Sequence, residues 1–361
     1  MEKVLFVSGM SGNGGTQTWT REYLKLFHSK DFELYHVNLS SRRSLKVDAS
    51  ILERIKDGLL DLRDVYFNVK EVLHNGRFPI MHAATSGSLG TLRDYFLVKL
   101  AHRYNTKGIL HCHYGCISED YNKKGLLGWL LRKTLNQYDQ IWVLDSHSES
   151  FLKSFKPLTN KVFLTPNFID VKEYTEIVSR DYKKIAFIGN IIPTKGVFEL
   201  TSAVKHLPDT ELLLIGPADS EIQEDLKLLI GNDSPRIKML GRMDNNDVVK
   251  LLAQVDIVAL PTYYPWEAFP ISILEAMTNG CLVISCARAA IPDMLTDTNG
   301  NSCGLLVEPK SDTSIADAIK WCQDNRLLAD KMRLMAHNKV KQCYASQVVF
   351  NRYATLYKQL V

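Results

Sequence analysis

The sequence predicts an α/β protein of two domains, each with a parallel β-sheet that helices cover on both faces. Its 361 residues exceed what one hydrophobic core usually takes. Short apolar runs rich in β-branched residues recur along the whole chain, and longer segments of helical periodicity separate them. Because these runs lack the polar alternation of a half-exposed strand, we expect both sheets to be buried on both faces.

The first half of the chain contains six such runs, and a helix from about residue 17 to 27 is predicted after the first of them. The predicted strands cover residues 3–8, 33–38, 79–82, 108–112, 140–144 and 162–164.

The second half repeats the arrangement, so we predict a pair of Rossmann-like domains. Pro166 and Asn167 end a predicted strand, and the boundary is expected between residues 166 and 182, with domains of 1–168 and 169–344. The predicted strands cover 184–188, 211–215, 237–240, 256–260, 282–285 and 304–307, and helices are predicted over 197–206, 221–229, 246–254 and 271–277.

Composition excludes several classes of protein. A hydrophobic fraction of 45% and a charged fraction of 23% are globular averages and argue against disorder. No apolar run reaches the roughly 18 residues of a spanning helix, and the start of the chain lacks the pattern of a secretory signal. The seven cysteines form no CxxC pair, which argues against a disulfide framework or a zinc ribbon. We therefore expect a cytoplasmic protein.

Charge is unevenly distributed along the chain. Residues 1–170 hold 23 Lys and Arg against 17 Asp and Glu, a net +6, whereas residues 171–361 carry a net −2. A basic first half indicates an anionic partner, such as phosphates or the inner face of a membrane. Arg42, Arg43 and Lys46 are the candidate contacts. The alternative is that the charges lie unevenly on a solvated surface that has no anionic partner. No nucleic-acid partner is predicted.

A glycine-rich loop follows the first predicted strand and ends at Gly14 and Gly15, directly before a helix. Glycines allow close backbone approach, and a helix N-terminus favours a phosphate. The loop departs from the dinucleotide fingerprint, because Gln17 stands where the last glycine belongs and residues 38–40 lack the ribose-binding acid. A nicotinamide dehydrogenase is therefore disfavoured. The alternative is that the glycines only permit a tight turn.

Two histidines lie at the end of the fourth predicted strand. Strand alternation places His111 and His113 on one side and Cys112 on the other, which disfavours a zinc site. Either imidazole could hydrogen-bond a substrate hydroxyl or take up a proton, and one of the two is expected to be a structural histidine.

The loops of the second half carry charged residues at strand ends. Lys195 precedes a predicted helix, where a compact cation suits a diphosphate. Glu267 lies in a predicted loop and Glu275 in the helix that begins near Pro270, so two carboxylates could address separate hydroxyl-bearing parts of one ligand. The amides of Ala268, Phe269 and Ile271 would be available to ligand oxygens. A local cap or ion pair is the alternative for Glu275.

These residues resemble the retaining glycosyltransferases of family four, which have the two-domain GT-B fold with a central cleft. The resemblance extends over essentially the whole chain and is strongest from 162 to 310. Its motifs are the E-x7-E pattern from Glu267 to Glu275, Gly14-Gly15, the strand end near His113, residues 166–170 and Lys195-Gly196.

The resemblance implies a role for each matching residue. Glu267 would hold hydroxyls of the transferred sugar and Glu275 the ribose of the nucleotide. Lys195 would stabilise the departing diphosphate, which amides near Gly15 would also face. His113 would contact the sugar, with His111 as the fallback. The resemblance also implies that a helix over about 345–361 packs back on the first domain.

Two positions depart from the family pattern. Asn190 stands where an arginine usually binds the diphosphate, so either another cation, for which Arg242 is the candidate, compensates or the leaving group is stabilised less. Phe168 replaces a frequent glycine and is expected to matter less.

The implied reaction is transfer of a hexose from a nucleotide-diphosphate sugar, with a UDP-sugar favoured, to a glycan or lipid-linked glycan. Front-face attack would retain the anomeric configuration, without a metal or cofactor. The alternatives are a sugar-nucleotide epimerase or hydrolase of the same fold and a non-catalytic nucleotide-sugar-binding subunit.

Overall fold

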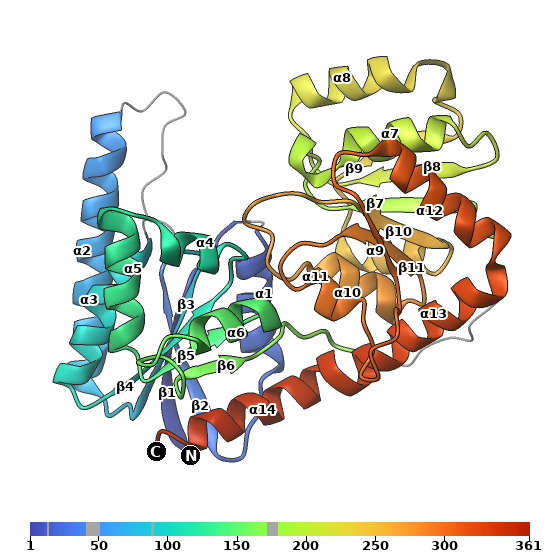
Figure 1. Ribbon diagram of the computed structural model, residues 1–361. Helices are drawn as coiled ribbons and strands as arrows, with labels where there is room; N and C mark the ends of the chain where they lie inside the picture. Colours follow the sequence, from blue (N-terminus) through green and yellow to red (C-terminus); the bar gives the residue numbers. More distant parts are fainter. Residues whose placement is uncertain (13, 41–50, 88–89, 172–179) are drawn as a thin grey trace. The chain divides into compact units, whose positions relative to one another are not determined.

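The computed structural model describes residues 1–12, 14–40, 51–87, 90–171 and 180–361 (Figure 1). The chain divides into two compact units. The first unit combines Met1–Asn167 with the C-terminal segment Val349–Val361, and the second is Phe168–Val348. The division thus falls one residue before the boundary expected from the sequence, and the C-terminal segment joins the first unit.

The first unit contains a parallel six-stranded sheet with the strand order β2-β1-β3-β4-β5-β6. All six predicted strands are present. β3 runs three residues further than predicted, because Ala83, Ala84 and Thr85 pair with the end of β4. The strands are β1 (Glu2–Ser8), β2 (Phe32–Asn38), β3 (Ile80–Thr85), β4 (Lys107–Cys112), β5 (Gln140–Val143) and β6 (Val162–Leu164).

Helices lie on both sides of this sheet (Figure 1). Every residue of β3 is buried, as expected for a strand covered on both faces. The first helix starts two residues earlier than predicted, because Gly14 adopts an extended conformation at the N-cap. The helices are α1 (Gly15–Leu26), α2 (Ile51–Asn75), α3 (Gly90–Arg103), α4 (Ile117–Asn122), α5 (Leu126–Gln137), α6 (Ser146–Lys153) and the C-terminal α14 (Ser346–Lys358).

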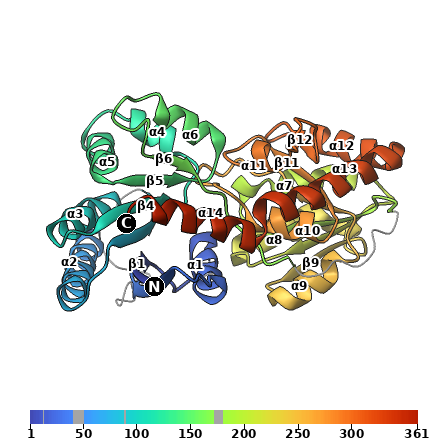
Figure 2. The ribbon, with the colours of Figure 1, turned by 90° about the horizontal axis from the view of Figure 1, so that it is seen from below.

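Helix α14 runs beside α1 (Figure 2), and its last turns complete an aromatic cluster there. Tyr357 is fully buried, and its hydroxyl hydrogen-bonds with the Tyr23 hydroxyl at 2.8 Å and with His82 Nδ1 at 2.6 Å. Its ring stacks on Trp142 of β5, with centroids 5.5 Å apart. The C-terminal segment is therefore part of the core of the first unit rather than an appended tail.

The second unit contains another parallel six-stranded sheet, with the order β12-β11-β10-β7-β8-β9. All the strands and helices predicted in this half are present, with ends that differ by at most two residues. The strands are β7 (Lys184–Ile188), β8 (Glu211–Ile215), β9 (Ile237–Gly241), β10 (Ile257–Leu260), β11 (Leu282–Cys286) and β12 (Leu305–Val307). The helices are η1 (Pro193–Lys195), α7 (Val197–Lys205), α8 (Ser220–Ile230), η2 (Gly231–Asp233), α9 (Asn245–Leu252), α10 (Ile271–Thr278), α11 (Ile291–Met294), α12 (Asp312–Asp324), α13 (Arg326–Lys339) and η3 (Val340–Tyr344).

Each sheet has a point where the strand order reverses. In the first unit β1 lies between β2 and β3, and in the second β7 lies between β8 and β10. Ligands of open α/β sheets bind beyond the carboxyl ends of the strands at such a point. We therefore expect ligands to bind at the loops after β1 and β3 and at those after β7 and β10.

The described part of the chain contains no helix long and apolar enough to cross a bilayer.

Replacement of Tyr357 by Phe tests the aromatic cluster. The change keeps the ring but leaves His82 Nδ1 and the Tyr23 hydroxyl without this partner, so the free energy of unfolding should fall by about 1–3 kcal/mol. Tyr35→Phe is the matched control, because that side chain is 48% exposed, and it should change stability by less than about 0.5 kcal/mol. Urea unfolding of the two variants measures both values. Equal effects would show that the buried hydroxyl contributes nothing specific.

Candidate functional site

The loops after β7 and β10 bring together two residues that the sequence singled out. Lys195 ends the short helix η1, and Glu267 lies in the loop between β10 and α10. Lys195 Nζ donates a hydrogen bond to Glu267 Oε2, and the two side chains are only 16% and 9% exposed. The amide of Tyr263 donates to the Thr194 carbonyl at 2.9 Å, which fixes one loop against the other. A cation and a carboxylate thus meet at the switch point of this sheet.

The Glu267 carboxylate is oriented through one of its two oxygens. The Thr262 hydroxyl donates to Oε2 at 3.3 Å, alongside Lys195. Lys195 Nζ also lies 5.4 Å from the centre of the Tyr264 ring, a cation–π contact. Within the described ranges, Oε1 accepts no hydrogen bond. One oxygen is therefore fixed by the protein, and the other is available to a ligand hydroxyl.

Gly196 allows the two loops to approach this closely. It links η1 to α7 with a φ of +75°, which an L side chain rarely adopts. A Cβ here would lie 2.3 Å from the Pro261 carbonyl oxygen at the end of β10. Glycine is therefore required both for the backbone conformation and for the contact that places Lys195 next to Glu267.

Glu275 lies on α10 with a half-buried side chain. Burial raises the pKa of its carboxyl from 4.5 to about 7. No salt bridge or side-chain hydrogen bond of Glu275 exists within the described residues, so the local cap or ion pair considered as an alternative is absent there. A carboxyl that is desolvated without a compensating partner is a candidate ligand-binding group.

The segment before α10 presents mainly backbone groups to a ligand. Ala268 accepts a hydrogen bond from the Ala290 amide at 3.0 Å, and the Phe269 ring packs against Tyr344 with centroids 5.3 Å apart. Pro270 is the N-cap of α10, and Ile271 is its first residue. Since the first amides of a helix have no intrahelical partner, any contact of this segment with a ligand would come from the backbone.

Asn190 and Arg242 are both exposed at strand ends, but they are not neighbours. Asn190 follows β7 and Arg242 follows β9, with β8 between them. Two strand spacings amount to about 9–10 Å. An extended arginine side chain spans much of that distance, so Arg242 stays a candidate for the missing cation.

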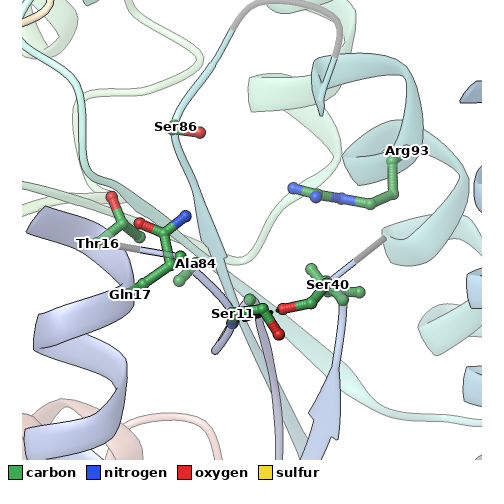
Figure 3. A pocket seen from close by; sticks show the side chains of 10 residues that line it. Ser11, Thr16, Gln17, Ser40, Ala84, Ser86 and Arg93 are labelled. Carbon is green, nitrogen blue, oxygen red and sulfur yellow. Dashed lines mark hydrogen bonds between the residues drawn. The ribbon is translucent and has the colours of Figure 1, made fainter. Parts of the chain in front are cut away.

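The first unit has a pocket of about 400 Å³ beyond β1 and β3 (Figure 3). Figure 3 shows the hydroxyls of Ser86 and Ser40 and the guanidinium of Arg93 around this space, with Thr16 and Gln17 of α1 opposite. Arg93 Nε and Nη2 donate to Asp94 Oδ1 at 2.9 and 2.7 Å. The pocket is lined by Gly9, Ser11, Gly12, Thr16, Gln17, Leu39, Ser40, Ala84, Ser86 and Arg93.

The glycine loop beside this pocket is fixed by side chains. Arg21 Nη1 donates to the carbonyls of Met10 and Gly12 at 2.8 and 3.0 Å. The Ser40 hydroxyl accepts the amides of Met10 and Ser11 at 3.0 and 2.7 Å. Gly14 and Gly15 begin α1, whose first turn contains no acidic residue, so its positive end is not neutralised locally.

The two histidines of β4 differ in their surroundings. His111 is wholly buried, with Nδ1 3.3 Å from His82 Nε2 and Nε2 3.3 Å from the Thr165 hydroxyl. Both of its nitrogens serve the core, which makes it a structural histidine. His113 follows the strand, is 8% exposed and packs against Trp19 with ring centroids 4.2 Å apart, while its Nε2 has no hydrogen-bond partner in the described part of the chain. Burial lowers the pKa of His113 to about 3, so the ring is neutral at physiological pH.

Sequence reasoning missed several residues of these two places. Thr262 directly follows β10 and orients Glu267, and Arg288 follows β11 and donates to the Pro265 carbonyl of the Glu267 loop. In the first unit it missed Ser86, which follows β3, and Arg93. Their position just after strands was the available signal for Thr262 and Ser86, whereas nothing local distinguishes Arg93.

Arg42, Arg43 and Lys46 lie outside the described residues. Among the residues that are described, no three His, Cys, Asp or Glu side chains gather in a way that could hold a metal ion.

Residues 172–340 match the family model described as "Glycosyl transferases group 1". Over 196 residues the chain is 25% identical to the UDP-Gal:alpha-D-GlcNAc-diphosphoundecaprenol alpha-1,3-galactosyltransferase of Escherichia coli. This match covers 46% of the chain and 46% of that protein, so it spans less than half of the relative's length.

Solved structures resemble the whole chain. Sucrose-phosphate synthase of Thermosynechococcus elongatus has a TM-score of 0.79 at 17% identity, covering 100% of this chain and 99% of that one. HepE of Anabaena, solved in complex with UDP and glucose, has a TM-score of 0.72 at 16% identity, covering 99% and 100%. At this identity the likeness concerns the fold. The predicted fold class, two Rossmann-like α/β domains of the GT-B type, is confirmed.

Replacement of Gly196 by Ala tests the approach of the two loops. Gly231→Ala is the matched control, because Gly231 also has a positive φ, +54°, but a Cβ there meets nothing within 4 Å. The control should lose about 1–2 kcal/mol of unfolding free energy from backbone strain alone. Gly196→Ala should lose about 1–3 kcal/mol more, because its Cβ collides with Pro261. Equal losses in urea unfolding would refute the close approach.

Proposed function

We propose that this protein transfers a hexose from a nucleotide-diphosphate sugar to a hydroxyl of a glycan or lipid-linked glycan, with retention of configuration. The match of residues 172–340 to the family model of glycosyl transferases group 1 supports this proposal. The proposed process is cell-surface polysaccharide biosynthesis. The observation that carries the proposal is the contact of Lys195 with Glu267 at the switch point of the second sheet.

The second unit is proposed to bind the donor. Lys195 would neutralise the diphosphate as it leaves, because an ammonium group is a compact phosphate partner. The diphosphate would compete with Glu267 for Lys195 and release Oε2, so that both carboxylate oxygens could accept hydroxyls of the transferred sugar. The desolvated carboxyl of Glu275 would accept the ribose hydroxyls, and the first amides of α10 would bind further donor oxygens. Asn190 and Arg242 would contact the same diphosphate from the ends of β7 and β9, which lie on either side of β8.

In the proposed reaction the bond between the anomeric carbon and the donor phosphate oxygen breaks, and its electron pair leaves with the diphosphate. The acceptor hydroxyl forms the new bond on the same face of the sugar, and its proton passes to a donor phosphate oxygen. The protein then acts by positioning and by charge stabilisation, without a nucleophile, metal or cofactor of its own. The neutral imidazole of His113 would hydrogen-bond the transferred sugar.

The first unit is proposed to bind the acceptor in the pocket beyond β1 and β3, whose hydroxyls and guanidinium suit a glycan that carries phosphate. The backbone amides near Gly14 and Gly15 would face phosphates at the positive end of α1. A UDP-sugar and an acceptor linked to a lipid diphosphate are favoured, because the Escherichia coli relative is named for UDP-Gal as donor and a diphosphoundecaprenol-linked sugar as acceptor. The protein would then work at the inner face of a membrane as a cytoplasmic, peripheral protein.

Replacement of Glu267 by Gln tests the proposed reaction. The change removes the charge that pairs with Lys195 and one sugar-binding acceptor, so kcat for sugar transfer should fall about 100-fold or more. Glu211→Gln is the matched control, because Glu211 forms an exposed ion pair with Lys238 at 3.0 Å, and it should leave kcat unchanged.

Transfer is measured with a panel of UDP- and GDP-sugars and lipid-linked acceptors, and the product's anomeric configuration is read by NMR. Unchanged turnover of Glu267→Gln, or an inverted product, would contradict the proposal. Sugar release or isomerisation without an acceptor would identify a hydrolase or an epimerase. Tight nucleotide binding without turnover would identify a binding subunit.

The raised pKa of Glu275 predicts pH-dependent nucleotide binding. Ribose hydroxyls donate to the ionised carboxylate, so binding favours the charged form. Below pH 7 the free protein must first release a proton from Glu275, and UDP should therefore bind about tenfold more weakly at pH 6 than at pH 8. Glu275→Gln is the control, because it removes the titrating carboxyl while the UDP phosphates still titrate. Calorimetry gives the ratio of the UDP dissociation constants at pH 6 and pH 8 for each protein. Equal ratios for the parent protein and the variant would exclude Glu275 as the titrating group.

A further inference from the structure

The first turn of α5 presents large apolar side chains to solvent. Leu126, Leu127 and Trp129 are 74%, 54% and 48% exposed. The opposite side of the same helix is buried, with Leu130, Leu131 and Leu135 at 8% exposure or less. The core therefore accounts for one side of α5, and the apolar residues of its first turn need another explanation.

Basic residues surround these apolar side chains. Residues 121–137 contain four Lys or Arg and no Asp or Glu. Lys124 and Lys133 are exposed, and Lys133 Nζ lies 6.0 Å from the centre of the Trp129 ring. Lys123 is also exposed and pairs with Asp120 of α4 at 2.6 Å, so it contributes less free charge than the other two. An aromatic and aliphatic protrusion with a basic rim suits an anionic lipid surface.

The fold holds this protrusion in place. Gly125 turns the chain into α5 with a φ of +93°, and a Cβ on Gly128 would lie 2.0 Å from the Lys123 carbonyl oxygen. Arg132 Nη1 donates to the Tyr121 carbonyl and, at 3.3 Å, to the Lys123 carbonyl. The turn is thus packed tightly against the helix that follows it. The exposure of Leu126 and Leu127 is part of the folded conformation rather than fraying of a helix end.

We propose that the α5 tip, defined as Lys123, Lys124, Leu126, Leu127, Trp129 and Lys133, docks on the surface of an anionic lipid bilayer. The leucines would enter the boundary between headgroups and acyl chains, and Trp129 would lie at the headgroup level. The lysines would extend toward the phosphates while their stems cover apolar surface. A second copy of the chain suits the tip less well, because a symmetric contact would bring like charges together.

This surface differs from the loop contacts at Arg42, Arg43 and Lys46 that the sequence suggested. The proposal rests on the proposed function, since docking would bring the protein to the membrane that holds a lipid-linked acceptor. The binding itself requires neither donor nor acceptor, so it can be measured separately.

Vesicle sedimentation of the full chain tests the α5 tip. The probes are vesicles of phosphatidylcholine mixed with phosphatidylglycerol and vesicles of phosphatidylcholine alone. L126S/L127S should lower the partition coefficient on the mixed vesicles roughly tenfold or more, because two exposed leucines lose their burial in lipid. The matched control is L327S/L328S on α13, a leucine pair that is 81% and 50% exposed, and it should partition like the parent protein. K124E/K133E should weaken binding to the mixed vesicles and leave the weak binding to phosphatidylcholine unchanged.

Equal partition of L126S/L127S and the parent protein, or equal losses in both leucine pairs, would overturn the proposal. Self-association that L126S/L127S abolishes, without vesicle binding by the parent, would make the tip an interface between copies instead. Transfer to a water-soluble acceptor separates this proposal from the function. L126S/L127S should keep that transfer, whereas Glu267→Gln should lose it and still bind vesicles.

Discussion

The candidate donor site depends on the pairing of β7 with β10 in the second sheet. Lys195 and Glu267 are 72 residues apart in the chain, and they meet because each follows one of two adjacent strands whose carboxyl ends point the same way. The Tyr263–Thr194 hydrogen bond and the lack of a side chain at Gly196 then fix the loops at contact distance. Because an unpaired buried charge is costly, Lys195 and Glu267 hold each other in place before a ligand binds.

The first unit uses its polar residues in two different ways. His82, His111, Tyr23 and Tyr357 hydrogen-bond with one another inside the core and fasten the C-terminal helix to the sheet. Ser40 and Arg21 lie at the carboxyl edge instead, where they fix the glycine loop and leave a polar pocket beside it. Polar side chains in the interior therefore hold the helix to the sheet, whereas those at the carboxyl edge shape the pocket.

The sequence predicted more of the fold than of the site. Every strand was predictable, because buried parallel strands read as short apolar runs with turn residues at their ends. The contact of Lys195 with Glu267 was not, since it depends on strand order, which no local pattern contains. The different surroundings of His111 and His113 depend on His82 and Thr165, which are distant in sequence. The pKa of Glu275 likewise depends on tertiary burial rather than on its neighbours in the chain.

A crystal structure of the protein with a bound UDP-sugar would show whether the loops after β7 and β10 bind the donor. We expect the diphosphate to lie within hydrogen-bond distance of Lys195 Nζ, hydroxyls of the sugar to bind Glu267 and the ribose to bind Glu275. The contact between Lys195 and Glu267 should lengthen relative to the ligand-free protein. A nucleotide bound away from these two loops, with the contact between Lys195 and Glu267 intact, would contradict the proposed donor site.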